Sequence, residues 1–266
     1  MLPTPDTSHV PYQRVYEPAE DSFLLLDTLS SATETAYLAR RFGSSIVAPL
    51  ILEVGPGSGV VIAFLTANAR TIFGTSDILT LGVDVNGFAC AATEKTVSRA
   101  VVTENNSSST KRQDEERETG TFLAAVQGDL TSPLRPGTID MLVFNPPYVP
   151  TAELPAAAFA PSSSSTQTTT FRQDSHLLEL SYAGGKDGME TTDRLIAALP
   201  IILSKRGCAY ILLCAQNRPE EVKERVRRWS GGGVGEVWKA ETVGTSGKQA
   251  GWEKLQIIRI WRETNV

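Results

Sequence analysis

Residues 50–59 restrict the possible folds more than any other stretch of the chain. The run LILEV at residues 50–54 is followed by the loop GPGSG, and apolar residues resume at Val60. This order predicts a buried strand that turns directly into a helix, with Gly55 and Gly57 where backbone approaches a ligand. Because Val60 stands where a dinucleotide fingerprint needs glycine, the loop favours an adenosyl cofactor that has no pyrophosphate. A tight turn without a ligand is the structural alternative.

The strand and helix pattern then repeats along the chain, which predicts an α/β fold. Four further apolar runs are expected to form strands, at residues 79–84, 122–126, 139–144 and 208–214. Helical patterns are expected at residues 18–42, 60 onward, 87–102, 191–203 and 219–229. Residues 235–243 and 255–261 flank a glycine-rich turn and predict a terminal antiparallel hairpin. We therefore expect one Rossmann-like domain spanning residues 1–266, with a seven-stranded, mostly parallel sheet and the hairpin at its edge.

Three segments are expected to lie outside this core. Residues 1–15 form an N-terminal extension. Residues 103–120 contain no aliphatic or aromatic side chain, so they are expected to form a flexible insertion. Residues 157–174, rich in serine and threonine, are expected to form a second one.

Composition weighs against several classes of function. The net charge of −5, the pI near 5.2 and the lack of a long basic tract weigh against duplex nucleic acid as a partner. The three cysteines and two histidines lack metal-ligand spacing, so no metal site is expected, and they favour a reducing intracellular compartment. The N-terminus lacks the apolar core of a signal peptide, and no apolar run is long enough to span a bilayer. We expect a soluble protein of the cytoplasm, with the nucleus as a second location.

The sequence Asn145-Pro146-Pro147-Tyr148 directly follows the apolar run at residues 139–144. Two prolines cannot continue a strand, so the strand is expected to end here, at the sheet edge where α/β proteins bind ligands. An amide side chain, the Pro146 carbonyl and a flat aromatic ring suit a planar amide or amino group. Tyr148 has an alternative role as a core aromatic residue, whereas Asn145 is harder to explain by structure alone.

Other candidate ligand contacts follow the remaining strands. Asp84 is placed to accept hydrogen bonds from a ribose diol, although it also suits a helix cap or a turn. Asp129 and Leu130 are placed to contact an adenine ring, and an ordinary turn explains the same residues. Glu20 and Asp21 are candidates too, but the helix dipole alone accounts for acids in a first helical turn.

Five stretches together resemble the eukaryotic HemK-like glutamine methyltransferases: residues 15–26, 52–61, 128–130, 142–150 and 182–188. The resemblance implies an S-adenosylmethionine-dependent enzyme that methylates the glutamine of the Gly-Gly-Gln motif in the class-1 translation termination factor. Cofactor contacts are then expected from Glu20, Asp21, Ser22, Glu53, Gly55, Gly57, Asp84, Asp129, Leu130 and Asn145. Asn145, Pro146 and Tyr148 are expected to hold the substrate amide. Bacterial relatives carry a helical domain ahead of this core, so the short segment before Tyr16 points to the eukaryotic and archaeal branch.

The same resemblance implies a heterodimer with a small zinc-binding activator protein, paired along the strand at residues 122–126. The termination factor, together with its GTPase partner, is the implied substrate. DNA adenine-N6 methylation and methylation of another protein are the alternative reactions. A DNA methyltransferase requires a flipped base and a cationic groove, neither of which this acidic sequence indicates. A non-catalytic adaptor is the alternative from a different class.

Overall fold

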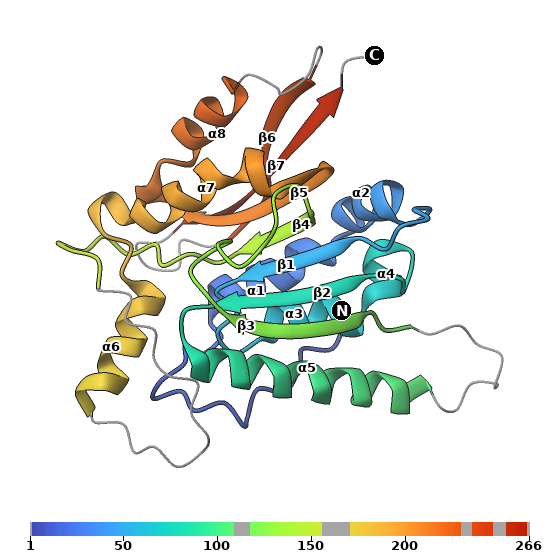
Figure 1. The fold of residues 1–266 in the computed structure, drawn as a ribbon, viewed down its shortest axis with the longest axis horizontal. Helices are drawn as coiled ribbons and strands as arrows, with labels where there is room; N and C mark the ends of the chain where they lie inside the picture. Colours follow the sequence, from blue (N-terminus) through green and yellow to red (C-terminus); the bar gives the residue numbers. More distant parts are fainter. Residues whose placement is uncertain (1, 109–117, 156–170, 230–235, 247–253, 265–266) are drawn as a thin grey trace.

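The computed structural model describes residues 2–108, 118–155, 171–229, 236–246 and 254–264. Seven strands form one sheet in the order β3-β2-β1-β4-β5-β7-β6, with β7 antiparallel to both of its neighbours (Figure 1). The other neighbouring pairs are parallel. The predicted α/β fold with a C-terminal hairpin at the sheet edge is therefore confirmed.

The strands follow the predicted apolar runs closely, except that β5 begins at Leu203, five residues before the predicted start at Cys208. Their bounds are β1 Leu50–Val54, β2 Leu79–Asp84, β3 Thr121–Gln127, β4 Ile139–Phe144, β5 Leu203–Cys214, β6 Glu236–Thr245 and β7 Leu255–Thr264. The whole of β4 is buried, as expected for a central strand covered on both faces. β3 lies at one edge of the sheet and β6 at the other.

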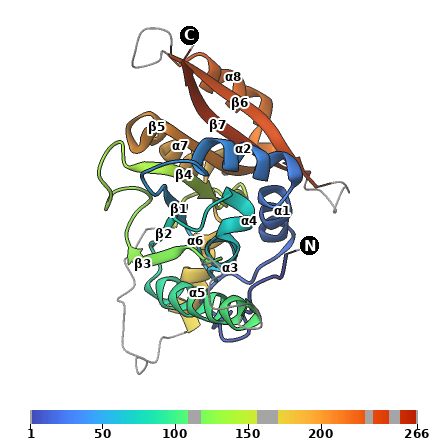
Figure 2. The same ribbon diagram turned by 90° about the vertical axis from the view of Figure 1, so that its right-hand side faces the viewer.

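Helices cover both faces of the sheet (Figures 1 and 2). Their bounds are α1 Glu20–Leu29, α2 Ala32–Phe42, α3 Val60–Ala67, α4 Ala69–Phe73, α5 Gly87–Ser108, α6 Phe171–Tyr182, α7 Glu190–Ile202 and α8 Pro219–Arg227. Short 3-10 turns precede α7 and α8, η1 at Lys186–Gly188 and η2 at Ala215–Asn217. One core cluster joins the sheet to α1 through α5, and a second joins it to α7 and α8. Among the described residues, none of the helices is long and apolar enough to cross a bilayer.

The single helix predicted at residues 18–42 is wrong, because two helices occupy this stretch. α1 ends at Leu29, and the side chain of Ser31 caps the next helix by accepting a hydrogen bond from the Glu34 backbone N–H at 3.3 Å. The cap satisfies one of the free N–H groups at a helix start. Continuous apolar periodicity hid this break.

Helical residues extend into both of the segments predicted as insertions. α5 continues to Ser108 rather than ending near Val102, and Thr119 is fully buried, with residues 109–117 outside the described part. Residues 156–170 are likewise outside it, but α6 begins at Phe171, inside the segment predicted as a loop. Polar residues can extend an exposed helix by propensity alone, so the end of an apolar pattern was a poor marker of the helix end.

The N-terminal segment packs along α5. Val10 and Val15 are buried against Ala89 and Ala92, forming a small separate core. The side-chain amide of Asn86 donates a 2.8 Å hydrogen bond to the Arg14 carbonyl. The extension is thereby held beside the carboxyl end of β2.

A buried ion pair joins the hairpin to α2. Glu34 is 1% exposed, and its Oε2 accepts hydrogen bonds from Arg259 Nη1 at 2.6 Å and from the Tyr210 hydroxyl at 2.7 Å. The guanidinium of Arg259 also stacks over the Tyr37 ring, 3.7 Å from its centroid. Because both charges are shielded from water, each depends on the other for compensation.

We expect Arg259→Ala to lower the free energy of unfolding by about 3–5 kcal/mol, because it leaves the Glu34 carboxylate buried without a cation. Equilibrium urea unfolding measures the change. Arg228→Ala is the matched control, since Arg228 forms an exposed ion pair with Glu224 and its loss should cost less than about 1 kcal/mol. Equal effects of the two substitutions would contradict the expectation.

Candidate active site

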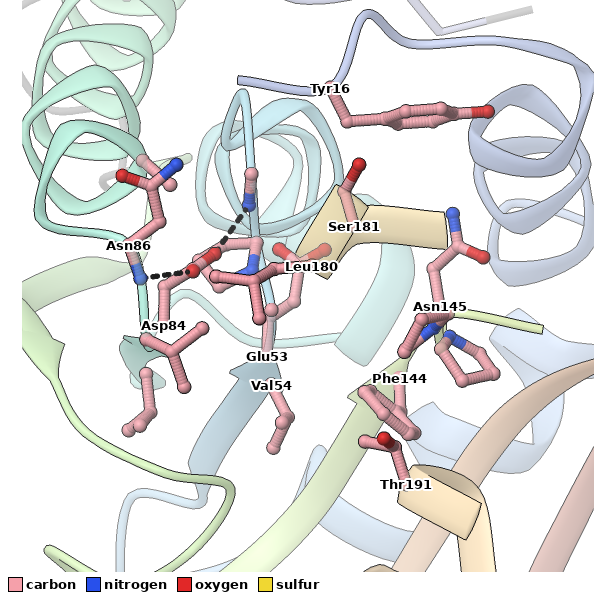
Figure 3. A pocket seen from close by; sticks show the side chains of 18 of the residues that line it. Tyr16, Glu53, Val54, Asp84, Asn86, Phe144, Asn145, Leu180, Ser181 and Thr191 are labelled. Atoms are coloured by element: carbon pink, nitrogen blue, oxygen red, sulfur yellow. Dashed lines mark hydrogen bonds between the residues drawn. The ribbon is translucent and has the colours of Figure 1, made fainter. Parts of the chain in front are cut away.

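A cavity of about 180 Å³ lies at the carboxyl end of the parallel strands (Figure 3). The loops that follow β1, β2, β3 and β4 form its floor, and residues of the N-terminal segment, α1 and α6 complete its walls. β1 lies between β2 and β4, where the chain reverses its direction of strand addition. Open α/β sheets bind ligands at this switch point.

The glycine loop after β1 has a backbone that favours glycine. Gly55, Gly57 and Gly59 have φ values of 63°, 55° and 78°. A Cβ on Gly59 would lie 2.6 Å from Thr93 Cα, so this glycine is required for packing against α5. A Cβ on Gly57 would meet nothing within 4 Å, and Gly57 lines the cavity. Gly57 therefore leaves room for a ligand, while Gly59 has a structural role.

Asp84, at the end of β2, fixes this loop. Its Oδ2 accepts a 3.1 Å hydrogen bond from the Gly57 N–H, and its Oδ1 accepts a 2.9 Å bond from the Asn86 N–H (Figure 3). Burial raises the pKa of Asp84 to about 6, although these backbone N–H groups oppose the shift. A carboxylate has about four acceptor sites, so it can hold the turn and still accept hydrogen bonds from a ligand.

Glu53, near the end of β1, is 2% exposed and lines the cavity from behind the loop. Its Oε2 accepts a 2.7 Å hydrogen bond from the Ile62 N–H in the first turn of α3. Burial, together with the nearby Asp84 charge, raises the pKa of Glu53 to about 8. Glu53 thus ties the strand to the helix on either side of the glycine loop.

Asn145, directly after β4, lines the cavity beside Pro146 and Pro147. Its Oδ1 is buried, and within the described part of the chain it has no hydrogen-bond partner. A buried polar atom without a partner costs free energy, so this oxygen is suited to a donor brought by a ligand. Figure 3 shows the Asn145 amide on the same side of the cavity as Tyr16 and Ser181.

Tyr148 does not line the cavity, which corrects the expectation that its ring forms the flat wall. Its hydroxyl instead donates to Asp21 Oδ2 at 3.5 Å, and its carbonyl accepts from the Asn217 side chain at 3.3 Å. Gly188 also packs tightly here, since a Cβ on it would lie 2.0 Å from the Tyr148 carbonyl oxygen. Phe144 and Tyr16 are the aromatic residues that line the cavity near Asn145.

Asp129 and Leu130 both line the cavity, where the loop after β3 reaches it. The Asp129 carboxylate forms an ion pair with Arg194 of α7, a second cavity residue. Leu130 has a φ of 51°, which is uncommon for a leucine. The pair therefore presents a carboxylate and an apolar side chain together, as predicted, but the carboxylate is shared with an arginine.

The two acids of the first turn of α1 lie in different environments. Glu20 is exposed and does not line the cavity, so the structure does not bring it together with the other predicted site residues. Asp21 and Ser22 are 3% and 5% exposed and do line it. Successive helix residues point about 100° apart, which is why one acid faces solvent and the next faces the cavity.

Comparison with known proteins gives full-length relatives. The chain is 32% identical over 271 residues to the fission yeast "eRF1 methyltransferase catalytic subunit mtq2", covering 100% of this chain and 98% of the relative. It is 32% identical over 267 residues to human "Methyltransferase HEMK2", covering 96% and 95% of the two chains.

The chain belongs to the HEMK2 and mtq2 methyltransferase family. An archaeal relative from Methanocaldococcus jannaschii, "Putative protein N5-glutamine methyltransferase MJ0928", is 29% identical over 252 residues, or 94% of this chain and 93% of the relative. No family model matches. Among solved structures, an rRNA methylase from Streptococcus thermophilus has a TM-score of 0.41 at 12% identity, covering 86% of this chain and 94% of that one.

Residues that sequence patterns did not indicate also line the cavity of this HEMK2-family enzyme. They come from the N-terminal segment, from the loop after β2 and from α6 and α7: Arg14, Tyr16, Asn86, Leu177, Leu180, Ser181, Thr191 and Arg194. Arg14 joins two of these walls, because its Nε donates a 2.8 Å hydrogen bond to Asp174 of α6. The spacing of the α6 leucines was the available signal, but the polar run before them obscured it. No cluster of metal-ligating side chains occurs in the described residues, and the three cysteines are buried and free.

We expect Glu53→Gln to change how stability depends on pH. The folded-state pKa of about 8 lies above the ordinary value of 4.5, so the folded enzyme retains a proton that the unfolded chain releases. Between these values the wild type loses about 1.4 kcal/mol of stability per pH unit from this group as pH rises. Glutamine carries no such proton, so variant minus wild-type unfolding free energy should rise with pH and level off above about pH 8. If the unfolding free energies of the variant and the wild type, measured with urea, changed with pH by the same amount across this range, the burial argument would be contradicted. A constant difference between the two proteins would not matter.

Proposed function

We propose that this methyltransferase transfers a methyl group from S-adenosylmethionine to the side-chain amide nitrogen of the glutamine in the Gly-Gly-Gln motif of the class-1 translation termination factor. The observation that carries the proposal is the buried, unpartnered Oδ1 of Asn145 in the cavity, an acceptor that suits one N–H of a primary amide. The fission yeast relative is named as an eRF1 methyltransferase, which supports the choice of substrate.

The residues of the cavity fit the proposed cofactor. Gly57 leaves open space next to the Asp84 carboxylate, which suits the close approach of a ribose diol. Asp129, Leu130 and Ser22 also line the cavity. Asp129 and Leu130 would hold the adenine amino group and ring face, and Ser22 would contact the cofactor's charged end. S-adenosylmethionine, when bound, supplies a methyl group carried on a sulfonium, and the neutral thioether that remains after transfer is a good leaving group.

The enzyme's contribution is to orient the nucleophile. An amide nitrogen is weakly nucleophilic because its lone pair is delocalised, so its direction relative to the methyl group matters more than a strong base. The Asn145 Oδ1 and the Pro146 carbonyl accept the two amide hydrogens and direct the nitrogen lone pair. Fixed orientation supplies up to about 7–11 kcal/mol in ideal cases, and a cavity shielded from water strengthens these hydrogen bonds.

DNA adenine is the closest alternative substrate, because an exocyclic amine offers the same two hydrogens. Duplex DNA requires a flipped base and phosphate contacts from a basic surface. The net charge is −5, and the cavity's Arg194 and Arg14 are engaged by Asp129 and Asp174. The protein amide is therefore the better match. An adaptor without catalysis would not need the buried Asn145 oxygen.

We expect Asn145→Ala to lower methyl transfer to the termination factor by about 10²–10³-fold, because it removes an acceptor that orients the amide. Labelled methyl transfer is measured with termination factor and, separately, with adenine-containing DNA. Calorimetry should find the cofactor Kd changed by no more than about threefold, since the glycine loop and Asp84 are intact. The control is Gln216→Ala, an exposed amide that does not line the cavity. Full activity of the Asn145 variant, or transfer to DNA alone by the wild type, would refute the proposal.

The zinc-binding activator is proposed to pair with β3. This strand is at the sheet edge, and its Leu123 is 52% exposed. On the adjacent α5, Val102 is 54% exposed. An edge strand with exposed apolar side chains is a site for strand addition by a partner.

We expect Leu123→Asp to lower copurification of the co-expressed activator at least about tenfold, because it places a charge in an apolar interface. Ile201→Asp is the matched control, since Ile201 is 63% exposed and lies on α7. Equal binding by both variants would place the activator elsewhere. A fully active, monodisperse enzyme without the activator would remove the proposed heterodimer.

A further inference from the structure

Asp21 is a buried carboxylate that the proposed amide clamp does not use. It lies in the first turn of α1, is 3% exposed and lines the cavity. Its Oδ2 accepts hydrogen bonds from the hydroxyls of Tyr16 at 3.1 Å and Tyr148 at 3.5 Å. Its Oδ1 accepts from the Ser22 N–H at 2.5 Å and the Ser22 hydroxyl at 3.1 Å.

The helix dipole does not explain this burial. A carboxylate at a helix N-terminus gains about 0.3–1 kcal/mol, and an exposed residue such as Glu20 gains it without leaving water. Burying a carboxylate costs several kcal/mol unless it is well compensated. Within the described residues, the hydrogen-bond donors to Asp21 are neutral, and no arginine or lysine pairs with it. These donors hold the Asp21 carboxylate in the cavity wall beside Tyr16, where it can take up a proton delivered through the tyrosine hydroxyl.

Tyr16 connects Asp21 to the position of the substrate amide. Its hydroxyl donates to Asp21, and its phenol oxygen can accept a further hydrogen bond. Figure 3 shows the Tyr16 ring on the side of the cavity where the Asn145 amide lies. Tyr148, three residues beyond Asn145, donates to the same Asp21 oxygen and fixes its direction.

We propose that Asp21, through Tyr16, accepts the proton that leaves the glutamine amide nitrogen during methyl transfer. The inference rests on the proposed function. The nitrogen lone pair forms the N–C bond, and the C–S bond breaks with its electron pair left on sulfur. As the nitrogen becomes tetrahedral, one N–H leaves its acceptor in the amide clamp. Its proton passes to the Tyr16 oxygen, its electron pair returns to nitrogen, and the Tyr16 proton passes to Asp21. The products are a neutral N-methyl amide, a neutral thioether and protonated Asp21, so atoms and charge balance.

The test separates the rate of transfer from cofactor binding. Asp21→Asn keeps the shape of the side chain but removes its ability to take the proton. We expect the single-turnover rate, at saturating cofactor and termination factor, to fall about 10²-fold. Calorimetry should find the cofactor Kd changed by no more than about threefold. Tyr16→Phe should act in the same direction, and the double variant should be no slower than Asp21→Asn, because both residues serve one path.

Tyr12→Phe is the matched control, because the Tyr12 hydroxyl bonds Thr7 and the residue does not line the cavity; its rate should equal the wild-type rate. If Asp21→Asn raised the cofactor Kd but left the rate at saturation unchanged, Asp21 would be a cofactor ligand and the inference would be overturned. An unchanged rate for Tyr16→Phe would also overturn the inference. Because this variant retains Asp21, it still tests the inference if Asp21→Asn fails to fold. The wild-type rate tests the proposed function separately, because no transfer by the wild type would refute that function first.

Discussion

The attachment of the glycine loop to two buried carboxylates is the constraint on which the site depends. Glu53 binds the first turn of α3, and Asp84 binds Gly57 from the neighbouring strand. Burial raises both pKa values, so ionising either carboxyl group in the folded protein costs free energy, and Glu53 keeps its proton below about pH 8. The backbone N–H bonds offset part of that cost and keep the loop in its positive-φ conformation. The floor of the cavity is therefore formed by the fold itself before any ligand binds.

The sequence was sufficient for the strands, because each apolar run ends in a residue that stops it. The bounds of β1, β2 and β4 matched the prediction. β1 ends before Gly55, β2 ends at Asp84, and β4 ends before Asn145-Pro146. Helix ends were harder. The break at Ser30 and Ser31 depends on a single capping bond, and the polar end of α5 has no periodicity to read. Such local contacts differ by about 1 kcal/mol, which is too little to be recognised from composition.

The candidate site was predictable to the extent that its residues follow strands. Asn145, Asp84 and Asp129 do, and all three line the cavity. The side chains of α6 and the N-terminal segment reach it only through tertiary packing, so they were missed. The Tyr148 ring faces Asp21, because the chain turns after Pro147 and packs against Gly188. Whether Glu20 or Asp21 faces inward depends on the rotation of α1 about its axis, and short helices with apolar residues on several sides do not define that rotation.

The two halves of the cavity differ in how firmly they are held. The floor on the side of the proposed cofactor is held by backbone hydrogen bonds of 2.7–3.1 Å to the buried carboxyl groups of Glu53 and Asp84. The opposite wall is tied by Arg14, through its carbonyl to Asn86 and through its guanidinium to Asp174, and both side chains of that ion pair are about one-fifth exposed. Such a partly exposed pair contributes on the order of 1 kcal/mol. The Glu53 bond to α3 is buried, whereas the ion pair of the opposite wall is partly exposed to water, so the two sides of the cavity are held with different strength.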